Sequence, residues 1–210
     1  MKIIEEYKVI FFDFDGVIKD SVDVKCKAYV SLFGEISPEL KYKISTHHLS
    51  NGGMPREIKI PLYMSWVGMG VDRVSVEGCT KIFSAKVVDD VINSPWVLGV
   101  QEFIKSAHMN TLLVIVTATP LEEIILILQK LEIINFFRAV YGWPCEKSAA
   151  ITEFLDVNSI DPDDAVFIGD AATDFHSACI SGVNFILRRS VSSSGVNLRD
   201  YDREIINFLE

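Results

Sequence analysis

The stretch that decides the fold is VIFFDFDGV, residues 9–17. Its first four residues form a compact apolar run, which is typical of a strand that is buried on both faces of a parallel sheet. Asp13 follows the run directly, and residues i and i+2 of an extended chain point the same way. The carboxylates of Asp13 and Asp15 are therefore predicted to face one site, and Gly16 lets the backbone turn sharply out of the strand.

Further apolar runs of the same kind recur along the chain, and helix-like segments separate them. This alternation predicts an α/β fold with a doubly wound, Rossmann-like parallel sheet. Ligands in such sheets bind at the carboxyl ends of the strands, so the residues that follow each run are the candidates for function. The further predicted strands are 112–116, 165–168 and 184–187, with 139–141 as a weaker candidate, and the predicted helices are 119–131, 147–156 and 171–181.

Residues 17–92 interrupt this alternation, because they contain no strong pair of strands. Turn signals lie at Ser37-Pro38 and at 51–53, and the segment is predicted to be a helical insertion. The predicted organisation is one α/β core domain, made of residues 1–16 and 93–210, with a small α-helical domain at 17–92. A surface loop is predicted at the serine-rich stretch 192–195. Within the insertion, the predicted helices are 24–33, 57–69 and 74–92.

The composition is that of a folded globular protein, with 49% hydrophobic and 23% charged residues. The formal net charge of −9 disfavours nucleic acid and anionic membranes as partners. A phosphate ester would need a local cation to reverse this field, and a divalent metal ion provides one. The N-terminal residues carry acids where a signal peptide is basic, so a cytoplasmic location is expected. No two of the four cysteines form a CxxC pair, which disfavours a zinc site.

A second motif, Thr117-Ala118-Thr119-Pro120, follows the predicted strand 112–116. Thr119 and Glu122 have the spacing of a capping box, so Thr119 is expected to serve as a helix cap and nothing more. The Thr117 hydroxyl and the free backbone N–H groups at the helix start form a cradle for an anion. The alternative is that this is an ordinary connection between a strand and a helix.

Two more motifs complete the set. Lys147 stands at a helix start, where the helix dipole disfavours a cation, which indicates a role in neutralising a phosphate or a nucleophile. An exposed lysine is the alternative. Asp170 ends a predicted strand, and Asp174 lies four residues later on the same helix face. Hard carboxylate ligands in this arrangement suit Mg²⁺, although two acids at a helix N-terminus can also simply complement the dipole.

The four motifs in this order, DxDGV, TxTP, Lys and GDxxxD, resemble those of the haloacid dehalogenase superfamily. The resemblance implies a Mg²⁺-dependent phosphatase that forms an aspartyl-phosphate on Asp13. Asp15 would act as general acid and base, and Lys147 would stabilise the charge of the nucleophile and the phosphate. The other implied roles are phosphoryl binding by Thr117 and the Ala118 amide, and Mg²⁺ binding by Asp13, the Asp15 carbonyl, Asp170 and, directly or through water, Asp174.

The insertion resembles the helical cap of the subfamily that contains phosphoglycolate phosphatases and β-phosphoglucomutase. Such caps close over the site and select the substrate. The segment around Arg56 is similar to a cap segment whose arginine contacts the non-reacting end of a substrate, so Arg56 is a candidate for binding a carboxylate or second phosphate. A surface arginine is the alternative. No role is assigned to Lys19, His47 or His48.

Three hypotheses follow from the resemblance. The first is a phosphatase that acts on a small phosphorylated metabolite. The second is a phosphomutase of the β-phosphoglucomutase type, and the third is a non-catalytic binding module, against which the intact set of motifs argues. Asp15 separates the chain from the dehalogenating members, which lack a carboxylate at this position, and it also disfavours the phosphonatase branch. The sequence leaves a monomer and a homodimer equally open and does not name the substrate.

Overall fold

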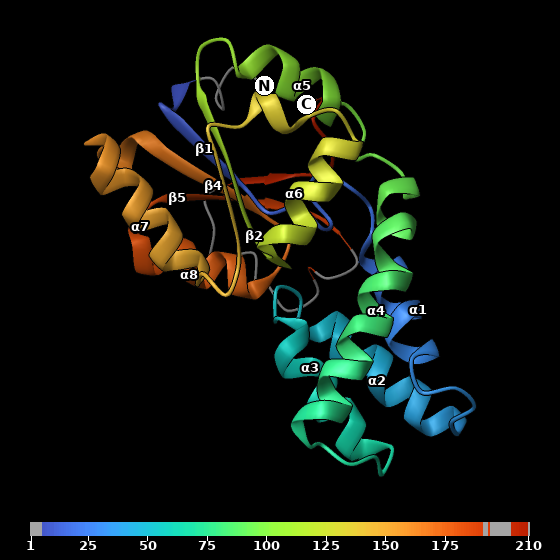
Figure 1. Cartoon of the computed structure of the whole chain (residues 1–210). Helices are drawn as coiled ribbons and strands as arrows, with labels where there is room; N and C mark the ends of the chain where they lie inside the picture. Colours follow the sequence, from blue (N-terminus) through green and yellow to red (C-terminus); the bar gives the residue numbers. More distant parts are fainter. Residues whose placement is uncertain (1–5, 191–192, 194–202, 210) are drawn as a thin grey trace.

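The computed structural model describes residues 6–190, 193 and 203–209, and its centre is a six-stranded sheet (Figure 1). All neighbouring strands are parallel, in the order β3-β2-β1-β4-β5-β6. This confirms the predicted α/β sheet, including the weaker strand candidate. Strand β6 was not predicted, because its three residues form no apolar run. The strands are β1 (Val9–Phe12), β2 (Leu112–Pro120), β3 (Ala139–Trp143), β4 (Ala165–Gly169), β5 (Asn184–Arg188) and β6 (Arg203–Ile205).

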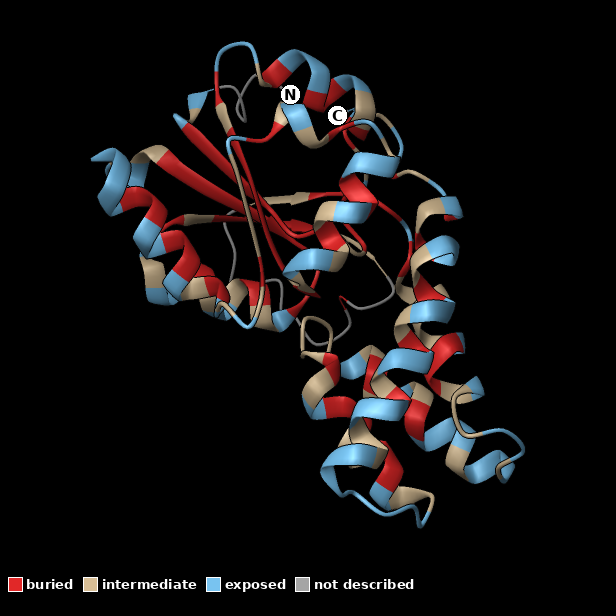
Figure 2. Cartoon of the chain, viewed as in Figure 1, coloured by how far each residue is buried: buried red, intermediate tan, exposed pale blue. Residues whose placement is uncertain are grey.

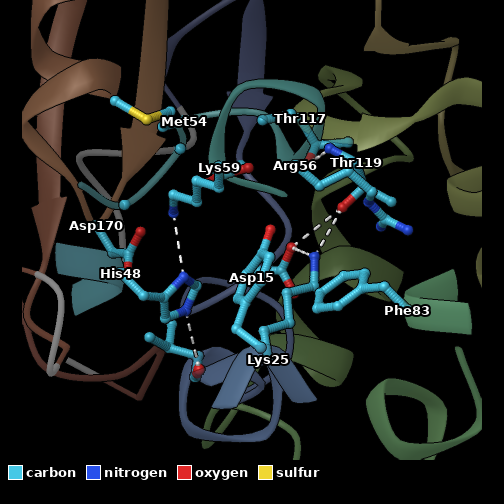
Figure 3. A pocket seen from close by; sticks show the side chains of 16 residues that line it. Asp15, Lys25, His48, Met54, Arg56, Lys59, Phe83, Thr117, Thr119 and Asp170 are labelled. Carbon is cyan, nitrogen blue, oxygen red and sulfur yellow. Dashed lines mark hydrogen bonds and ion pairs between the residues drawn. The ribbon is translucent and has the colours of Figure 1, made fainter. Parts of the chain in front are cut away.

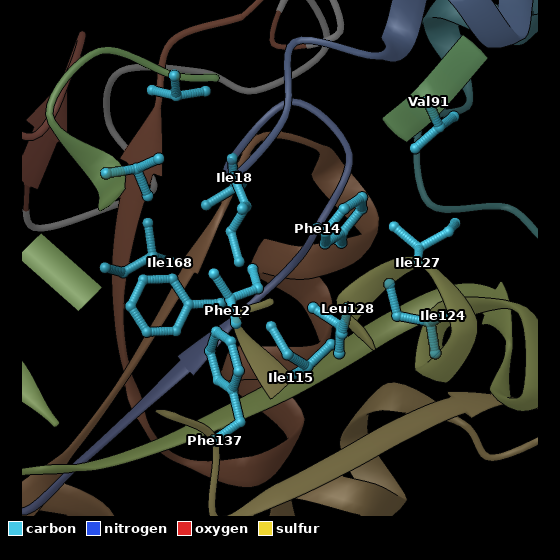
Figure 4. Close-up of a cluster of buried hydrophobic side chains, with 14 of the residues drawn as sticks. Phe12, Phe14, Ile18, Val91, Ile115, Ile124, Ile127, Leu128, Phe137 and Ile168 are labelled. Atoms are coloured by element: carbon cyan, nitrogen blue, oxygen red, sulfur yellow. The ribbon is translucent and has the colours of Figure 1, made fainter. Parts of the chain in front are cut away.

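Helices cover both faces of the sheet (Figures 1 and 2). Successive β1 residues point to opposite faces, so Phe11 packs on Phe154 of α7 while Phe12 packs on Phe103 of α5. Figure 4 shows the second of these two clusters, in which Phe12 and Ile168 lie near Leu128 of α6. The helices of the core are α5 (Val100–Ala107), α6 (Leu121–Lys130), α7 (Lys147–Asn158) and α8 (Ala172–Ser181), with short 3₁₀ turns η2 (Ile134–Phe136) and η3 (Pro162–Asp164).

Four consecutive helices between β1 and α5 pack on one another and lie beside the carboxyl ends of the strands (Figure 1). Helix α2 was not predicted, and it begins at the predicted turn. Pro38 is its first residue, and the Ser37 hydroxyl accepts the Leu40 N–H at 3.3 Å. Ser-Pro is therefore a helix start here. Helix α5 was also not predicted. The four helices are α1 (Val22–Ser31), α2 (Pro38–Ser50), α3 (Arg56–Trp66) and α4 (Arg73–Asn93).

Two connections join these four helices to the sheet, and Lys19 lies where the connections meet. Its side chain is 1% exposed, and its ammonium donates to the Ile92 carbonyl at 2.9 Å in the last turn of α4. The ammonium also lies 4.4 Å from the centre of the Trp96 ring. A cation at a helix C-terminus is favoured by the helix dipole. Lys19 thus fixes the junction between the helices and the sheet.

The predicted loop 192–195 lies largely outside the described residues. Ser193 alone is described, and it is buried, with its hydroxyl donating to the Asp170 carbonyl at 3.0 Å. Among the described helices, none is long and apolar enough to cross a membrane.

Candidate active site

The carboxyl ends of three neighbouring strands bring predicted residues from separate motifs into one cavity. Strand β1 lies between β2 and β4, and the Asp13 N–H continues the pairing by donating to the Ile168 carbonyl at 3.0 Å. Asp13, Thr117 and Asp170 line one cavity (Figure 3).

Gly16 allows the loop after β1 to pass close to Asp170. Its φ is +78°, in the left-handed region, and a Cβ placed there would lie 2.1 Å from Asp170 Oδ2. Any side chain at this position would therefore displace Asp170. The glycine of the first motif brings the Asp15 backbone and the Asp170 carboxylate to the same part of the cavity.

Asp13 is buried beside a single lysine. Its Oδ1 accepts the Phe14 N–H at 2.7 Å and lies 3.1 Å from Lys147 Nζ. Burial raises the pKa of Asp13 to about 6 against the lowering effect of Lys147, and the carboxylates of Asp174 and Asp15 add to the rise. Burial alone would lower the pKa of Lys147, but Asp13 and Asp174 raise it above its ordinary value. Lys147 is therefore a permanent cation between two carboxylates.

Asp174 is completely buried and forms hydrogen bonds through both carboxylate oxygens. Oδ1 lies 2.6 Å from Lys147 Nζ, and Oδ2 accepts the N–H groups of Asp170 at 3.2 Å and Ala171 at 3.1 Å. Carboxylate oxygens of Asp13, Asp170 and Asp174 lie within 4.8 Å of one another. Lys147 pairs with Asp13 and Asp174, and three buried carboxylates gather here, so this oxygen-rich cluster fits an additional hard cation such as Mg²⁺.

Asp15 is held by three donors, two of them in the loop and first helical turn that follow β1 and the third in β2. Oδ1 accepts the Ser21 hydroxyl at 2.6 Å, and Oδ2 is paired with Lys25 and accepts the Thr119 hydroxyl at 3.3 Å. Burial alone would raise the pKa of Asp15, but the Lys25 charge and these hydrogen bonds hold it below its ordinary value. Lys25 was missed by the sequence analysis. The signal for it was its place in the first turn of a helix that starts directly after the first motif.

The prediction that Thr119 serves only as a helix cap is wrong. Strand β2 continues through Pro120, and α6 begins at Leu121 with Pro120 as its N-cap and no side-chain cap. The Thr119 hydroxyl instead accepts from Lys25 at 2.9 Å and donates to Asp15. The capping-box spacing was misleading because the strand runs further than its apolar residues indicate. Thr119 thus belongs to the cavity.

Helices α2 and α3 contribute a basic wall to the same cavity (Figure 3). Lys59 is 2% exposed, and its ammonium lies 3.1 Å from His48 Nδ1. His48 Nε2 lies 3.4 Å from the Val22 carbonyl, so Nε2 carries the hydrogen and Nδ1 accepts from Lys59. Burial, followed by the Lys25 charge, lowers the pKa of Lys59 to about 7. Burial and Lys59 lower the pKa of His48 to about 3, so this imidazole is neutral.

Arg56, predicted to contact substrate, also lines the cavity, but its guanidinium is paired within the protein. Nη1 donates to Glu123 Oε2 at 2.8 Å and to the Ser84 hydroxyl at 2.7 Å, and Nη2 donates to the other oxygen of Glu123. The pair is buried and bidentate, and it joins α3 to α6. The sequence analysis did not single out Glu123.

A loop before α3 makes a second contact with the core. The Gly52 carbonyl accepts the Thr173 hydroxyl at 2.7 Å, and Gly53 has a φ of +73°. A Cβ on Gly53 would lie 2.1 Å from that hydroxyl oxygen, so the loop is seated closely on α8. His47 plays no part in the cavity lining, because its ring nitrogen contacts the Tyr63 hydroxyl at 3.0 Å among the rings of α3.

Comparisons with known sequences agree with this arrangement. The profile of the haloacid dehalogenase-like hydrolase family matches residues 10–188, which is most of the chain. A phosphoglycolate phosphatase from Pseudomonas fluorescens is 23% identical over 185 residues, covering 85% of this chain and 68% of its own. The segment that the family profile matches, residues 10–188, contains every motif described above.

Solved structures share the whole fold at low sequence identity. A structure described as a predicted phosphoglycolate phosphatase from Haemophilus somnus superposes with a TM-score of 0.79 at 16% identity, covering 97% of this chain and 95% of its own. CbbY from Rhodobacter sphaeroides, in complex with phosphate, gives 0.78 at 15% identity, with 97% and 96% covered. A haloacid dehalogenase-like family hydrolase from Streptococcus pneumoniae gives 0.71 at 18%, with 97% and 96% covered.

Proposed function

Because the chain belongs to the haloacid dehalogenase-like hydrolase family, we propose that it is a Mg²⁺-dependent phosphatase that forms an aspartyl-phosphate on Asp13. The observation that carries the proposal is the buried cluster of Asp13, Lys147, Asp170 and Asp174, with Asp15 beside it in the same cavity. Phosphoryl transfer depends mainly on positioning and on charge compensation, and this cluster supplies both. The substrate is a small phosphorylated metabolite.

Asp13 attacks in the first step. Phe14 and Lys147 both contact Oδ1, so Oδ2 forms the new bond to phosphorus as the bond from phosphorus to the ester oxygen breaks. The departing alkoxide takes a proton from Asp15. In the second step water attacks phosphorus, Asp15 accepts its proton, and the bond between Asp13 and phosphorus breaks to release inorganic phosphate. Thr117 and the Ala118 amide hold the phosphoryl oxygens.

Lys25 affects Asp15 both as the acid of the first step and as the base of the second step. Its ammonium and the hydroxyls of Ser21 and Thr119 keep Asp15 ionised in the arrangement described. An ionised carboxylate is ready to accept the proton of water, as the second step needs. The first step needs the protonated form, which the second step regenerates when Asp15 accepts the proton of water.

Mg²⁺ fits the cluster of buried carboxylates and is part of the proposal. Asp13, Asp170 and the Asp15 carbonyl would hold it, with Asp174 acting directly or through water. When bound, the cation offsets the negative charge of the carboxylates and of the phosphoryl group. Lys147 remains the protein's own cation at Asp13 in either case.

Residues 17–92 form the cap in this proposal, and the core consists of 1–16 and 93–210. The cap supplies the basic wall opposite Asp13, while the Arg56–Glu123 pair and the Gly52–Thr173 hydrogen bond hold it against the core. Closure of such a wall excludes water and selects the substrate. The cytoplasmic location and the choice between a monomer and a homodimer stay predictions.

The test is a panel of phosphorylated metabolites incubated with the protein and Mg²⁺, in which inorganic phosphate and isomeric sugar phosphates are both measured. We expect the wild type to release inorganic phosphate only in the presence of Mg²⁺, and we expect Asp13→Asn to release none. Formation of an isomer without phosphate release would make the chain a phosphomutase. A folded wild-type protein that is inactive on every compound would support a non-catalytic binding module.

A further inference from the structure

Lys59 is a buried cation that forms no ion pair with any described residue, although the charge of Asp15 acts on it from a greater distance. Its side chain is 2% exposed and lines the cavity that also contains Asp13. Among the described residues, no carboxylate lies within ion-pair distance of its ammonium. Its hydrogen bond goes to the neutral imidazole of His48, and its ammonium lies 5.8 Å from the centre of the Tyr29 ring.

This arrangement is costly for the protein without a ligand, because a buried ammonium loses its hydration and forms no close ion pair in return. The other long cations of the cap wall differ from it in this respect. Arg56 is paired with Glu123, and Lys25 is paired with Asp15. Of these three cations of the cavity, Lys59 is therefore the one that forms no ion pair with a described residue.

His48 fixes the orientation of the Lys59 ammonium. Its Nε2–H group is used by the Val22 carbonyl, which fixes the ring so that Nδ1 accepts one hydrogen of the ammonium. An ammonium has three hydrogens, and His48 takes one of them. Figure 3 shows the hydrogen bond between Lys59 and His48, two residues that line the same cavity as Met54 and Asp170.

We propose that Lys59, oriented by His48, binds a second anionic group of the substrate, a carboxylate or second phosphate at the end remote from the transferred phosphoryl group. This inference rests on the proposed function and deepens it, since it narrows the substrates to compact phosphate esters with a second negative charge. It also assigns the remote contact to Lys59, whereas the guanidinium of Arg56 serves the ion pair with Glu123.

The test compares two ligands of equal size, phosphonoacetate and its neutral isostere phosphonoacetamide, by titration calorimetry on the full chain with Mg²⁺. We expect the wild type to bind phosphonoacetate roughly ten- to a hundredfold more tightly, as for a charge-assisted hydrogen bond. In Lys59→Met this preference should vanish, and in Lys59→Arg it should be largely kept. The exposed Lys81 offers a matched control, and Lys81→Met should keep the full preference.

Propane-1,3-diphosphonate, compared with propylphosphonate, distinguishes a second phosphate from a carboxylate as the preferred remote group. The proposal is overturned if Lys59→Met still prefers phosphonoacetate to phosphonoacetamide. It is also overturned if the wild type binds the two ligands equally well or does not bind phosphonoacetate. Loss of the preference in Arg56→Met, with Lys59→Met unaffected, would move the contact to Arg56. A chain that binds phosphonoacetate through Lys59 but hydrolyses no phosphate ester would overturn the proposed function alone.

Discussion

The two walls of the cavity differ in charge, in origin and in how they are encoded. The core wall carries the acids Asp13, Asp15 and Asp170 in the loops that directly follow strands. The cap wall carries Lys25 and Lys59 on helices, at positions with no recognisable motif. In the proposed function, the core wall acts on the phosphoryl group of the substrate and the cap wall contacts the rest of the molecule.

The largest expected effect comes from the core wall. Asp13→Asn keeps the size of the side chain but removes the nucleophile, so kcat should fall by roughly three orders of magnitude or more for every substrate. Steady-state kinetics on several phosphate esters measures this, and circular dichroism checks the fold. Near wild-type turnover by a folded Asp13→Asn protein would contradict the covalent mechanism.

Removal of the metal should be nearly as severe. Oxygens of three buried carboxylates lie within 4.8 Å of one another in the cluster, so EDTA should abolish activity and added Mg²⁺ should restore it. Asp170→Ala should raise the Mg²⁺ concentration needed for half-maximal activity, because the cation loses a hard anionic ligand. Ca²⁺ should inhibit, since its coordination is larger and looser. Full activity in EDTA would show that the cluster works without a cation.

Loss of the ion pair between Arg56 and Glu123 should have an intermediate effect. Arg56→Met leaves the buried Glu123 carboxylate without its partner, and Glu123→Gln leaves the guanidinium without a counter-ion, which typically costs about 3–5 kcal/mol for a buried pair. If the pair holds the cap, both variants should raise KM by a similar factor, about tenfold, for substrates with and without a second anion. The double variant should be less than additive.

This experiment also decides the prediction that Arg56 contacts substrate. A loss in Arg56→Met that is confined to substrates with a second anion, with Glu123→Gln unaffected, would place Arg56 on the ligand. Para-nitrophenyl phosphate is the reference substrate, since it has no second anionic group.

The smallest expected effect is a pH dependence of stability in the absence of ligand. Folding lowers the pKa of Lys59 from 10.5 to about 7, so the unfolded chain binds more protons between these values. The contribution of Lys59 to the free energy of unfolding should therefore rise with pH across this window. The groups that face Lys59 are His48 of α2, Asp15, and Lys25, Cys26 and Tyr29 of α1.

Thermal unfolding of the wild type and Lys59→Met at pH 6.5 and pH 9 measures this contribution. The variant should be the more stable protein at pH 6.5, and its advantage should shrink at pH 9. A difference in stability between the variant and the wild type that does not change with pH would show that folding does not lower the pKa of Lys59. Lys81→Met is the control, because its ammonium is exposed.

The sequence predicted the core wall well because its residues are tied to the ends of apolar strands. Asp13 and Asp170 each follow a buried run, and parallel strands bring such positions together whatever the rest of the chain does. The role of Thr119 was missed because strand β2 continues past its apolar residues, which moved the start of the helix beyond Thr119.

The cap wall was not predictable in the same way. Lys59 and His48 meet only after α2 and α3 have packed together, and nothing in their spacing distinguishes them from surface residues. Arg56 was singled out through a resemblance, yet Glu123, which pairs with it, lies 67 residues away on α6. Tertiary packing, not local pattern, determines which of these cations is paired within the protein.

The most direct measurement is mass spectrometry of the acid-quenched protein during turnover of para-nitrophenyl phosphate with Mg²⁺. Its leaving group needs little help from an acid, so Asp15→Asn should impair the second step more than the first and let the intermediate accumulate. The account predicts that one phosphoryl group is found on the peptide containing Asp13 in Asp15→Asn, at a higher level than in the wild type. A turning-over protein with no phosphoryl group on Asp13, or with one on another residue, would contradict it.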